Sequence, residues 1–125
     1  MGRGFEDLEV YQAPRAFRVR VCRLARQLPE DERFNLCSQM RRAALSVTNC
    51  IAEGHGSRGF KHNISYLYRA RGSVCELIDD LNACSDESYF KVEHLNDLRS
   101  DADRLLQLVN GYIRHLRRRM EDCTD

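Results

Sequence analysis

Apolar residues recur every three or four positions in four stretches of this chain, and glycine or proline breaks the pattern between several of them. This spacing places apolar side chains on one face of an α-helix, whereas a half-buried strand would alternate apolar and polar residues. The pattern therefore predicts four amphipathic helices and an all-α fold.

Each predicted helix carries one apolar stripe. In chain order the stripes are Val10, Pro14, Phe17, Val21, Leu24 and Leu28; Leu36, Met40, Ala43, Val47 and Ile51; Phe60, Ile64, Leu67, Val74, Ile78 and Leu81; and Leu95, Leu98, Ala102, Leu105, Val109, Tyr112 and Leu116. Helices of about 20 to 30 residues are ~30 to 45 Å long. Joined by short loops, they pack most economically as an antiparallel up-down-up-down four-helix bundle.

Proline leaves the start of the first helix open. Pro14 lacks a backbone donor and clashes with the preceding turn inside a helix. Either the helix starts near Ala13, or a helix from about Asp7 is kinked at Pro14. We favour the kinked helix because Leu8 and Tyr11 keep the helical spacing.

The other helix boundaries follow from glycines and from the ends of the stripes. Gly54-His55-Gly56 predicts a C-cap and a turn after the second helix. The third helix is expected at about 59–83 and the fourth at about 91–120.

Length and composition predict one domain that spans residues 1–125. Hydrophobic residues make up 42% and charged residues 31% of the chain. No apolar run approaches the roughly 20 residues of a membrane-spanning helix, and Met1–Glu9 lacks the apolar core of a signal peptide. We therefore expect a cytoplasmic protein without a membrane partner.

Cysteine and histidine spacing argues against a metal or redox cofactor. No two cysteines have C-x-x-C spacing, and no histidines form an H-x-x-x-H pair. Most cysteines fall at apolar positions, so we expect reduced and mostly buried thiols. The six cysteines are Cys22, Cys37, Cys50, Cys75, Cys84 and Cys123, and the four histidines are His55, His62, His94 and His115.

Motifs for catalysis are missing from the sequence. There is no G-x-S-x-G context for a nucleophilic serine and no G-x-x-x-x-G-K-[ST] phosphate loop. Repeated Glu-x-x-His pairs, which bind metals in helical bundles, are also absent. We expect a protein that is not an enzyme and that needs no cofactor.

Polar residues follow one side of the second and third predicted helices at steps of three and four. They are Gln39, Arg42, Ser46, Asn49 and Glu53, and Arg69, Ser73, Glu76 and Asp80. If these helices run antiparallel, Arg42 comes level with Glu76, and Gln39 with Asp79 or Asp80. The pattern predicts an ion pair between Arg42 and Glu76.

Arg71 occupies a place between Leu67 and Val74 where an apolar residue is expected. Its guanidinium either forms a structural bridge, extends to the surface along its own stem, or faces a ligand or partner. Together with polar residues of the second and third helices, Arg71 forms a candidate polar network for interaction or for structure. Its members are Gln39, Arg41, Arg42, Glu53, Arg71 and Glu76.

Basic residues gather at the end of the fourth predicted helix. Either they complement the C-terminal helix dipole, or they form a phosphate-binding patch together with Arg41 and residues near the second turn. No exposed aromatic ladder is evident, because Tyr66, Tyr68, Tyr89 and Tyr112 are assigned to packing. The candidate basic patch consists of Arg58, Lys61, Arg114, Arg117, Arg118 and Arg119.

Three stretches resemble the 23S rRNA-intervening-sequence protein family. QMRRAALSVTNCIAEG (Gln39–Gly54) is similar to the family pattern Q-[LIM]-R-R-A-x-x-S-[IV]-x-x-N-[IV]-A-E-G. FEDLEVYQ (Phe5–Gln12) and ARGSVCEL (Ala70–Leu77) resemble the signatures of the first and third helices. Cys50 stands where the family has asparagine, and Pro14 is unusual within the first helix.

The resemblance implies a four-helix bundle that assembles into a closed homo-oligomeric ring, commonly a pentamer. The family takes its name from reading frames inside insertions of bacterial 23S rRNA genes. It is distantly similar to accessory proteins of diversity-generating retroelements, which are pentameric barrels that bind nucleic acid and a reverse transcriptase. The resemblance implies no enzymatic activity and no established molecular function.

Six apolar residues off the main stripes are consistent with a ring. They are Val19, Leu45, Leu77, Leu106, Leu108 and Ile113. They either widen the core or form a second apolar face for a neighbouring subunit. Contacts that repeat by rotation close into a ring.

Two functions follow from these features. The first is association with RNA or an RNA–protein complex through arginines that ring symmetry multiplies. The second is a protein-interaction scaffold without nucleic-acid binding. Since the formal net charge is only +1, binding to nucleic acid requires a local basic patch.

Overall fold

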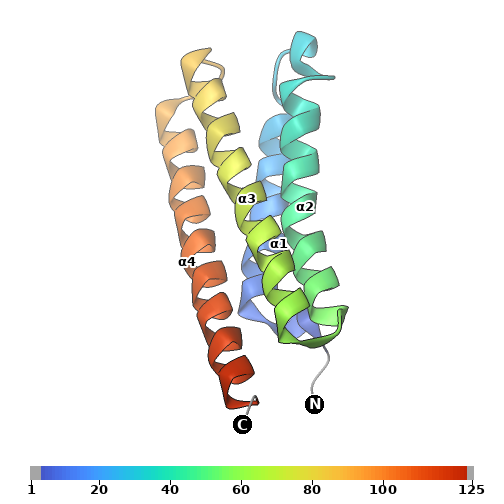
Figure 1. Ribbon diagram of the computed structural model, residues 1–125. Helices are drawn as coiled ribbons and strands as arrows, with labels where there is room; N and C mark the ends of the chain where they lie inside the picture. Colours follow the sequence, from blue (N-terminus) through green and yellow to red (C-terminus); the bar gives the residue numbers. More distant parts are fainter. Residues whose placement is uncertain (1–3, 124–125) are drawn as a thin grey trace.

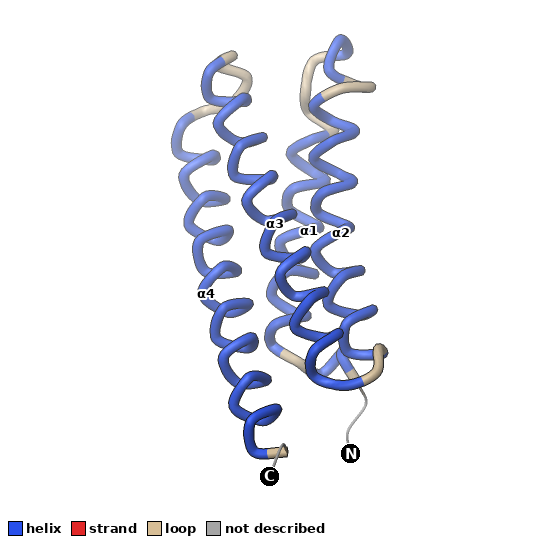
Figure 2. The backbone as a smooth tube through the Cα atoms, in the orientation of Figure 1, coloured by secondary structure: helices blue, strands red, loops and turns tan. Residues whose placement is uncertain are grey.

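The computed structural model describes residues 4–123 and contains four long α-helices and two short 3-10 helices (Figure 1). The α-helices are α1 (Glu9–Ala25), α2 (Leu36–Gly56), α3 (Gly59–Asp86) and α4 (Val92–Asp122). The 3-10 helices are η1 (Phe5–Asp7) and η2 (Glu30–Glu32). Figure 2 shows helices joined by short loops and no strand in the part of the chain that is described. The predicted all-α fold is confirmed.

Successive helices run in opposite directions, as Figure 1 shows. α2 packs on α1 and α3, α3 packs also on α4, and α4 returns to contact α1. The helices thus form the predicted up-down-up-down bundle. We call the end with the α2–α3 turn, the start of α1 and the end of α4 the basal end, and the opposite end the apical end.

The apolar stripes form one hydrophobic core. Every predicted stripe residue of α1 and α2 is buried, and most of those in α3 and α4 are buried as well. Phe60, Ile78 and Tyr112 are only half-buried. Leu77 and Ile113, two of the apolar residues off the main stripes, have 0% and 4% of their surface exposed, so they widen the core, which was one of the two alternatives for them. The core of α3 is therefore wider than the predicted stripe.

Pro14 lies inside α1, which begins at Glu9 and continues to Ala25. The early start of the favoured kinked helix is therefore confirmed, a start near Ala13 is wrong, and the kink at Pro14 stays a prediction. The proline ring is fully buried. Its apolar packing compensates in part for the backbone hydrogen bond that proline is unable to donate.

The turn between α2 and α3 consists of Ser57 and Arg58. α2 ends at Gly56, as predicted, and the Ser57 hydroxyl donates a hydrogen bond of 2.6 Å to the carbonyl of Gly54. The glycine with a positive φ is Gly59, at +76°, rather than Gly54 or Gly56. Gly54 is instead a buried residue at the contact between α2 and α3. Its role is close packing and not the turn.

All six cysteines are free, and only Cys84 is buried. The prediction that most thiols are buried is wrong, because Cys75 and Cys123 are exposed and the other three are partly exposed. Helical spacing places these cysteines near an apolar stripe. A small difference in angular position around the helix axis then decides whether the side chain enters the core. Burial among apolar groups raises the pKa of the Cys84 thiol to about 11.

A hydrogen bond joins the two apical connections. The Tyr89 hydroxyl, between α3 and α4, donates to Glu32 Oε2 of η2 at 2.6 Å. This bond lowers the pKa of Glu32 and raises that of Tyr89 to about 12. It ties together two loops that lie 57 residues apart in the sequence.

Asp80 is a buried acid on α3, with 5% of its surface exposed, and its Oδ2 has no hydrogen-bond partner in the described part of the chain. Burial, together with the nearby charges of Glu76 and Asp79, raises the pKa of this carboxyl from 3.8 to about 6. The charged form therefore destabilises the fold.

Gly54 and Gly72 test the packing of α2 on α3. A Cβ at Gly54 would lie 2.8 Å from both Tyr66 Cβ and Asn63 Oδ1, whereas a Cβ at Gly72 meets nothing within 4 Å. We expect Gly54→Ala to lower the free energy of unfolding by about 1–3 kcal/mol through overpacking. Gly72→Ala should raise it by about 0.5–1 kcal/mol through helix propensity. Urea denaturation measures both, and equal effects would contradict the close contact.

Asp80 predicts a pH dependence of stability. Because its folded pKa of about 6 exceeds the ordinary 3.8, its contribution is complete below pH 3.8 and is lost as pH rises through 6. We expect Asp80→Asn to stabilise the protein at pH 7.5 by on the order of 1–3 kcal/mol, with little effect at about pH 3.5, below the ordinary pKa of the carboxyl. Thermal unfolding at both pH values measures this, with the exposed Asp103→Asn as control. A pH-independent effect of Asp80→Asn would contradict the assignment.

Candidate functional site

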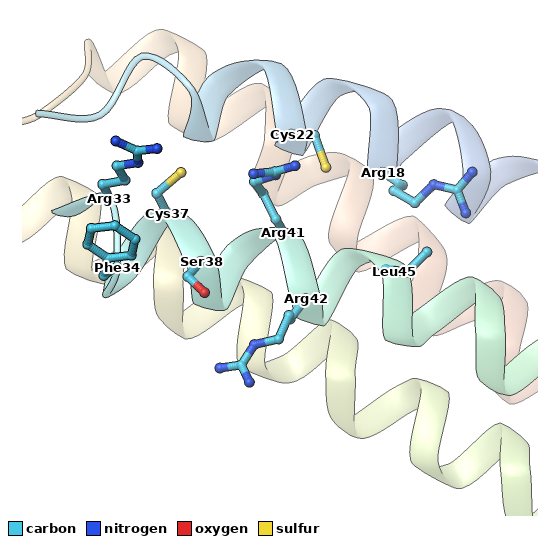
Figure 3. A pocket seen from close by; sticks show the side chains of 9 residues that line it. All are labelled: Arg18, Cys22, Arg33, Phe34, Cys37, Ser38, Arg41, Arg42 and Leu45. Atoms are coloured by element: carbon cyan, nitrogen blue, oxygen red, sulfur yellow. The ribbon is translucent and has the colours of Figure 1, made fainter. Parts of the chain in front are cut away.

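A groove of about 660 Å³ runs along the outer side of α1 and α2 (Figure 3). Its lining combines basic and apolar side chains from α1, from the residues before α2 and from the first half of α2. We call it the arginine groove, and its lining residues are Arg18, Cys22, Arg33, Phe34, Cys37, Ser38, Arg41, Arg42 and Leu45.

Four guanidinium groups line the arginine groove, and no carboxylate from residues 4–123 lines it with them. In Figure 3, Arg41 extends from α2 toward Cys22 on α1, and Arg42 points to the other side of α2. Arg33 lies 3.5 Å from Glu30 in a highly exposed ion pair, which contributes little. Neither Arg41 nor Arg42 has a carboxylate partner in the described part of the chain. The groove therefore carries uncompensated positive charge.

Arg18 is held in place by a buried hydroxyl. Its Nη1 donates a hydrogen bond of 2.7 Å to Thr48 Oγ1, and this hydroxyl donates in turn to the carbonyl of Leu45 at 3.1 Å. Thr48 is 1% exposed, so both of its hydrogen bonds are needed inside the bundle. The bonded guanidinium loses little conformational freedom when an anion binds.

Phe34 is the exposed aromatic of the groove, with 86% of its surface accessible. The Arg33 guanidinium lies 5.1 Å from the centre of its ring. A single ring is not the aromatic ladder that the candidate basic patch was expected to lack, but it lies beside basic side chains on this other surface. Arg18, Arg33 and Phe34 were missed because only folding brings α1 and the segment before α2 next to Arg41.

A second groove, between α2 and α3, contains most of the predicted polar line. The hydroxyls of Ser46 and Ser73 are hydrogen-bonded at 2.9 Å. The predicted register of α2 against α3, which places Arg42 opposite Glu76, is therefore confirmed. Ser46 also lies 3.8 Å from the Cys50 sulfur. Arg42 and Glu76 both line this groove, as does Glu53.

The predicted ion pair between Arg42 and Glu76 is not formed in the described structure. Both side chains are exposed, and solvent competes for their charges. Gln39 does not reach across to α3 either, since its amide donates to Asn35 Oδ1 at 3.4 Å. The serine pair, rather than an ion pair, joins these helices.

Arg71 has a structural role. Its Nη1 donates to Asn110 Oδ1 of α4 at 2.9 Å, and its guanidinium lies 4.6 Å from the ring centre of Tyr68. Ala70, fully buried, takes the core position expected of Arg71. Of the three alternatives for Arg71, the structural bridge describes its contacts.

The candidate basic patch lies at the basal end, where α3 begins and α4 ends. Arg117 donates a hydrogen bond to the hydroxyl of Tyr68. This tyrosine is 36% exposed, so it lies outside the core and packs against arginine side chains. Arg41 belongs to the arginine groove instead of this patch. The basic residues are therefore divided between two surfaces.

The described residues contain no group of three or more histidine, cysteine or acidic side chains that would hold a metal ion. Within the same range, no helix has both the length and the apolar character needed to cross a membrane. The perturbed acid Asp80 is enclosed on α3 and does not line either groove.

Comparison with known proteins identifies related sequences and a related fold. The family model described as 23S rRNA-intervening sequence protein matches residues 6–111. A crystal structure of a protein of unknown function from the S23 ribosomal protein family of Bacteroides thetaiotaomicron superposes with a TM-score of 0.78. It has 21% sequence identity, and the match covers 84% of this chain and 95% of that one. No curated protein matches significantly.

A pair of double-mutant cycles tests what joins α2 to α3. We expect Ser46→Ala and Ser73→Ala to be coupled by about 1 kcal/mol, because each hydroxyl loses its partner when the other is removed. Arg42→Ala and Glu76→Ala should be additive within about 0.5 kcal/mol. Unfolding free energies from urea denaturation give both coupling energies. A coupled charge pair beside an additive serine pair would contradict this arrangement.

Proposed function

Since the chain belongs to the 23S rRNA-intervening sequence protein family, which has no established molecular function, we propose a function from the geometry. The protein is a non-enzymatic nucleic-acid-associated protein. It binds RNA or an RNA–protein complex through the arginine groove.

One observation carries this proposal: four guanidiniums and an exposed phenyl ring line one groove without a carboxylate from the described residues. Guanidiniums bind backbone phosphates and release condensed counterions. An aromatic ring beside them provides a surface on which an unpaired base stacks. Phe34 lies close enough to Arg33 for one nucleotide to contact both side chains.

The arginine groove suits this role better than the basal patch. Arg41 and Arg42 have no ion pair in the described structure, whereas the guanidinium of Arg117 is occupied by a hydrogen bond to the hydroxyl of Tyr68. Every lining residue of the groove also falls within the range of the family match.

The proposal includes assembly into a closed homo-oligomeric ring, a pentamer by the resemblance to the family. Val19 on α1 and Leu45 on α2 are 42% and 47% exposed, and these apolar side chains suit contact with a second copy. Rotational repetition places several arginine grooves on one particle although each chain has a formal charge of only +1. A cytoplasmic location fits six free cysteines.

A protein-interaction scaffold is the second candidate. Phe34 and Leu45 give the groove an apolar component that would also fit a protein partner. The two candidates differ in their response to salt, because only phosphate binding releases counterions in proportion to the contacts made.

Fluorescence anisotropy with a labelled RNA hairpin that has a single-stranded loop tests the proposal. We expect affinity to fall at least about tenfold between 50 and 200 mM salt. Arg41→Gln/Arg42→Gln should weaken binding at low salt and reduce the salt slope by about 2 per groove engaged. Phe34→Ala should weaken binding with little change of slope.

Arg104→Gln, an exposed arginine of α4 outside both grooves, is the matched control and should bind as wild type. Light scattering on the same samples checks that each variant keeps the assembly, with an expected mass that is a multiple of 14.6 kDa. No salt-dependent binding at micromolar protein would overturn the nucleic-acid proposal. Unchanged binding by the double variant would overturn the role of the groove.

A further inference from the structure

A separate cavity of about 290 Å³ lies at the basal end, between the α2–α3 turn and the last turns of α4. It shares no lining residue with the arginine groove. Its wall combines basic, amide and aromatic side chains. The residues that carry the argument are His55, Phe60, Asn63, Tyr112, His115 and Arg119.

Neighbouring groups hold several of these side chains in position. The Arg119 guanidinium lies over the ring of Phe60, 5.6 Å from its centre. The rings of Tyr112 and His115 are stacked, with 5.9 Å between their centres. Asn63 forms a side-chain hydrogen bond with Tyr112. These contacts reduce the conformational entropy that a ligand would have to remove on binding.

The charges around the cavity have one sign. Arg119 is permanently charged, the imidazoles of His55 and His115 line the same cavity, and no carboxylate from residues 4–123 lines it. α3 begins here without a side-chain cap or an acidic residue in its first turn, so its N-terminal dipole favours an anion, while the C-terminal dipole of α2, which ends at the same turn, opposes this effect. The positive charge of the lining therefore comes from Arg119. The lining therefore favours an anion and supplies no internal counterion.

We propose that this cavity binds a phosphate monoester. The terminal phosphate offers three oxygens, enough for the fork of Arg119 and for the rings of His55 and His115 on its other sides. Phe60 and Tyr112 supply apolar surface for the group that the phosphate carries. The phosphate belongs either to the end of a nucleic-acid strand or to a small phosphorylated molecule.

This site does not rest on the proposed role of the arginine groove. His115 and Arg119 lie beyond residue 111, where the family match ends. The cavity is therefore built in part by a segment of this chain that the family model does not include.

Titration with inorganic phosphate at pH 6.5, followed through the imidazole C2 protons, tests the site. The chain has four histidines, so each resonance is assigned with one histidine variant. We expect saturable shifts of His55 and His115, while His62 and His94, which do not line the cavity, stay constant. Arg119→Gln should weaken binding at least tenfold.

Arg118→Gln is the control, since it removes the same charge one residue away from a side chain that does not line the cavity, and its affinity should change less than twofold. The Arg41→Gln/Arg42→Gln variant should bind phosphate as wild type, so a failure of the RNA proposal is separable from a failure here. Absence of saturable shifts, or equal losses in the Arg119 and Arg118 variants, would overturn the site.

Two further arms identify the source of the phosphate. A short RNA with a 5′-phosphate is compared with the same RNA bearing a 5′-hydroxyl, and a nucleoside monophosphate is titrated alone. Tighter binding of the phosphorylated RNA, lost in Arg119→Gln, assigns the site to strand ends. Binding of the monophosphate without discrimination between the RNAs assigns it to small phosphorylated molecules.

Discussion

Close packing between α2 and α3 at Gly54 determines where the other surfaces of this bundle lie. The missing side chain lets Tyr66 and Asn63 approach the α2 backbone, and a turn of only two residues prevents the helices from sliding past each other. The hydrogen bond between Ser46 and Ser73 forms in this register, near the middle of α2 and α3. With α2 fixed, its outer face can only meet α1 or solvent, and the arginine groove forms there.

Most of the fold was predictable from helical spacing, and the failures have definite causes. The stripe from Leu36 to Ile51 is wholly buried because an apolar period repeated over about four turns leaves little choice of face. Arg71 was misplaced because the small residue beside it, Ala70, gives a weak apolar signal although it occupies the core. The helical period predicts only approximately which face of a helix is buried. Neighbouring positions at the edge of that face therefore cannot be separated into core and half-exposed side chains from the sequence.

Prediction of the site was less complete, because a site depends on which helices become neighbours. Arg41 and Arg42 were identified as candidates, but nothing local to the sequence relates them to Arg18 or to Phe34. Antiparallel packing brings these residues together. Folding also separates Arg41, in the first half of α2, from the arginines at the end of α4, because α2 starts at the apical end and α4 ends at the basal end. Charge pairing was the weakest inference, since Arg42 and Glu76 come level as expected and yet remain exposed without bonding.

The order of the helices has a consequence for how the chain folds. Three of the four interhelical contacts join helices that follow one another along the chain, so each needs only a short loop to close. The contact of α1 with α4 is different, because it joins the two most distant helices and carries the ion pair between Arg20 and Asp101. Loop-closure entropy therefore makes docking of the first helix on the last the slowest pairing to nucleate. We therefore expect the contact between α1 and α4 to form last as the chain folds.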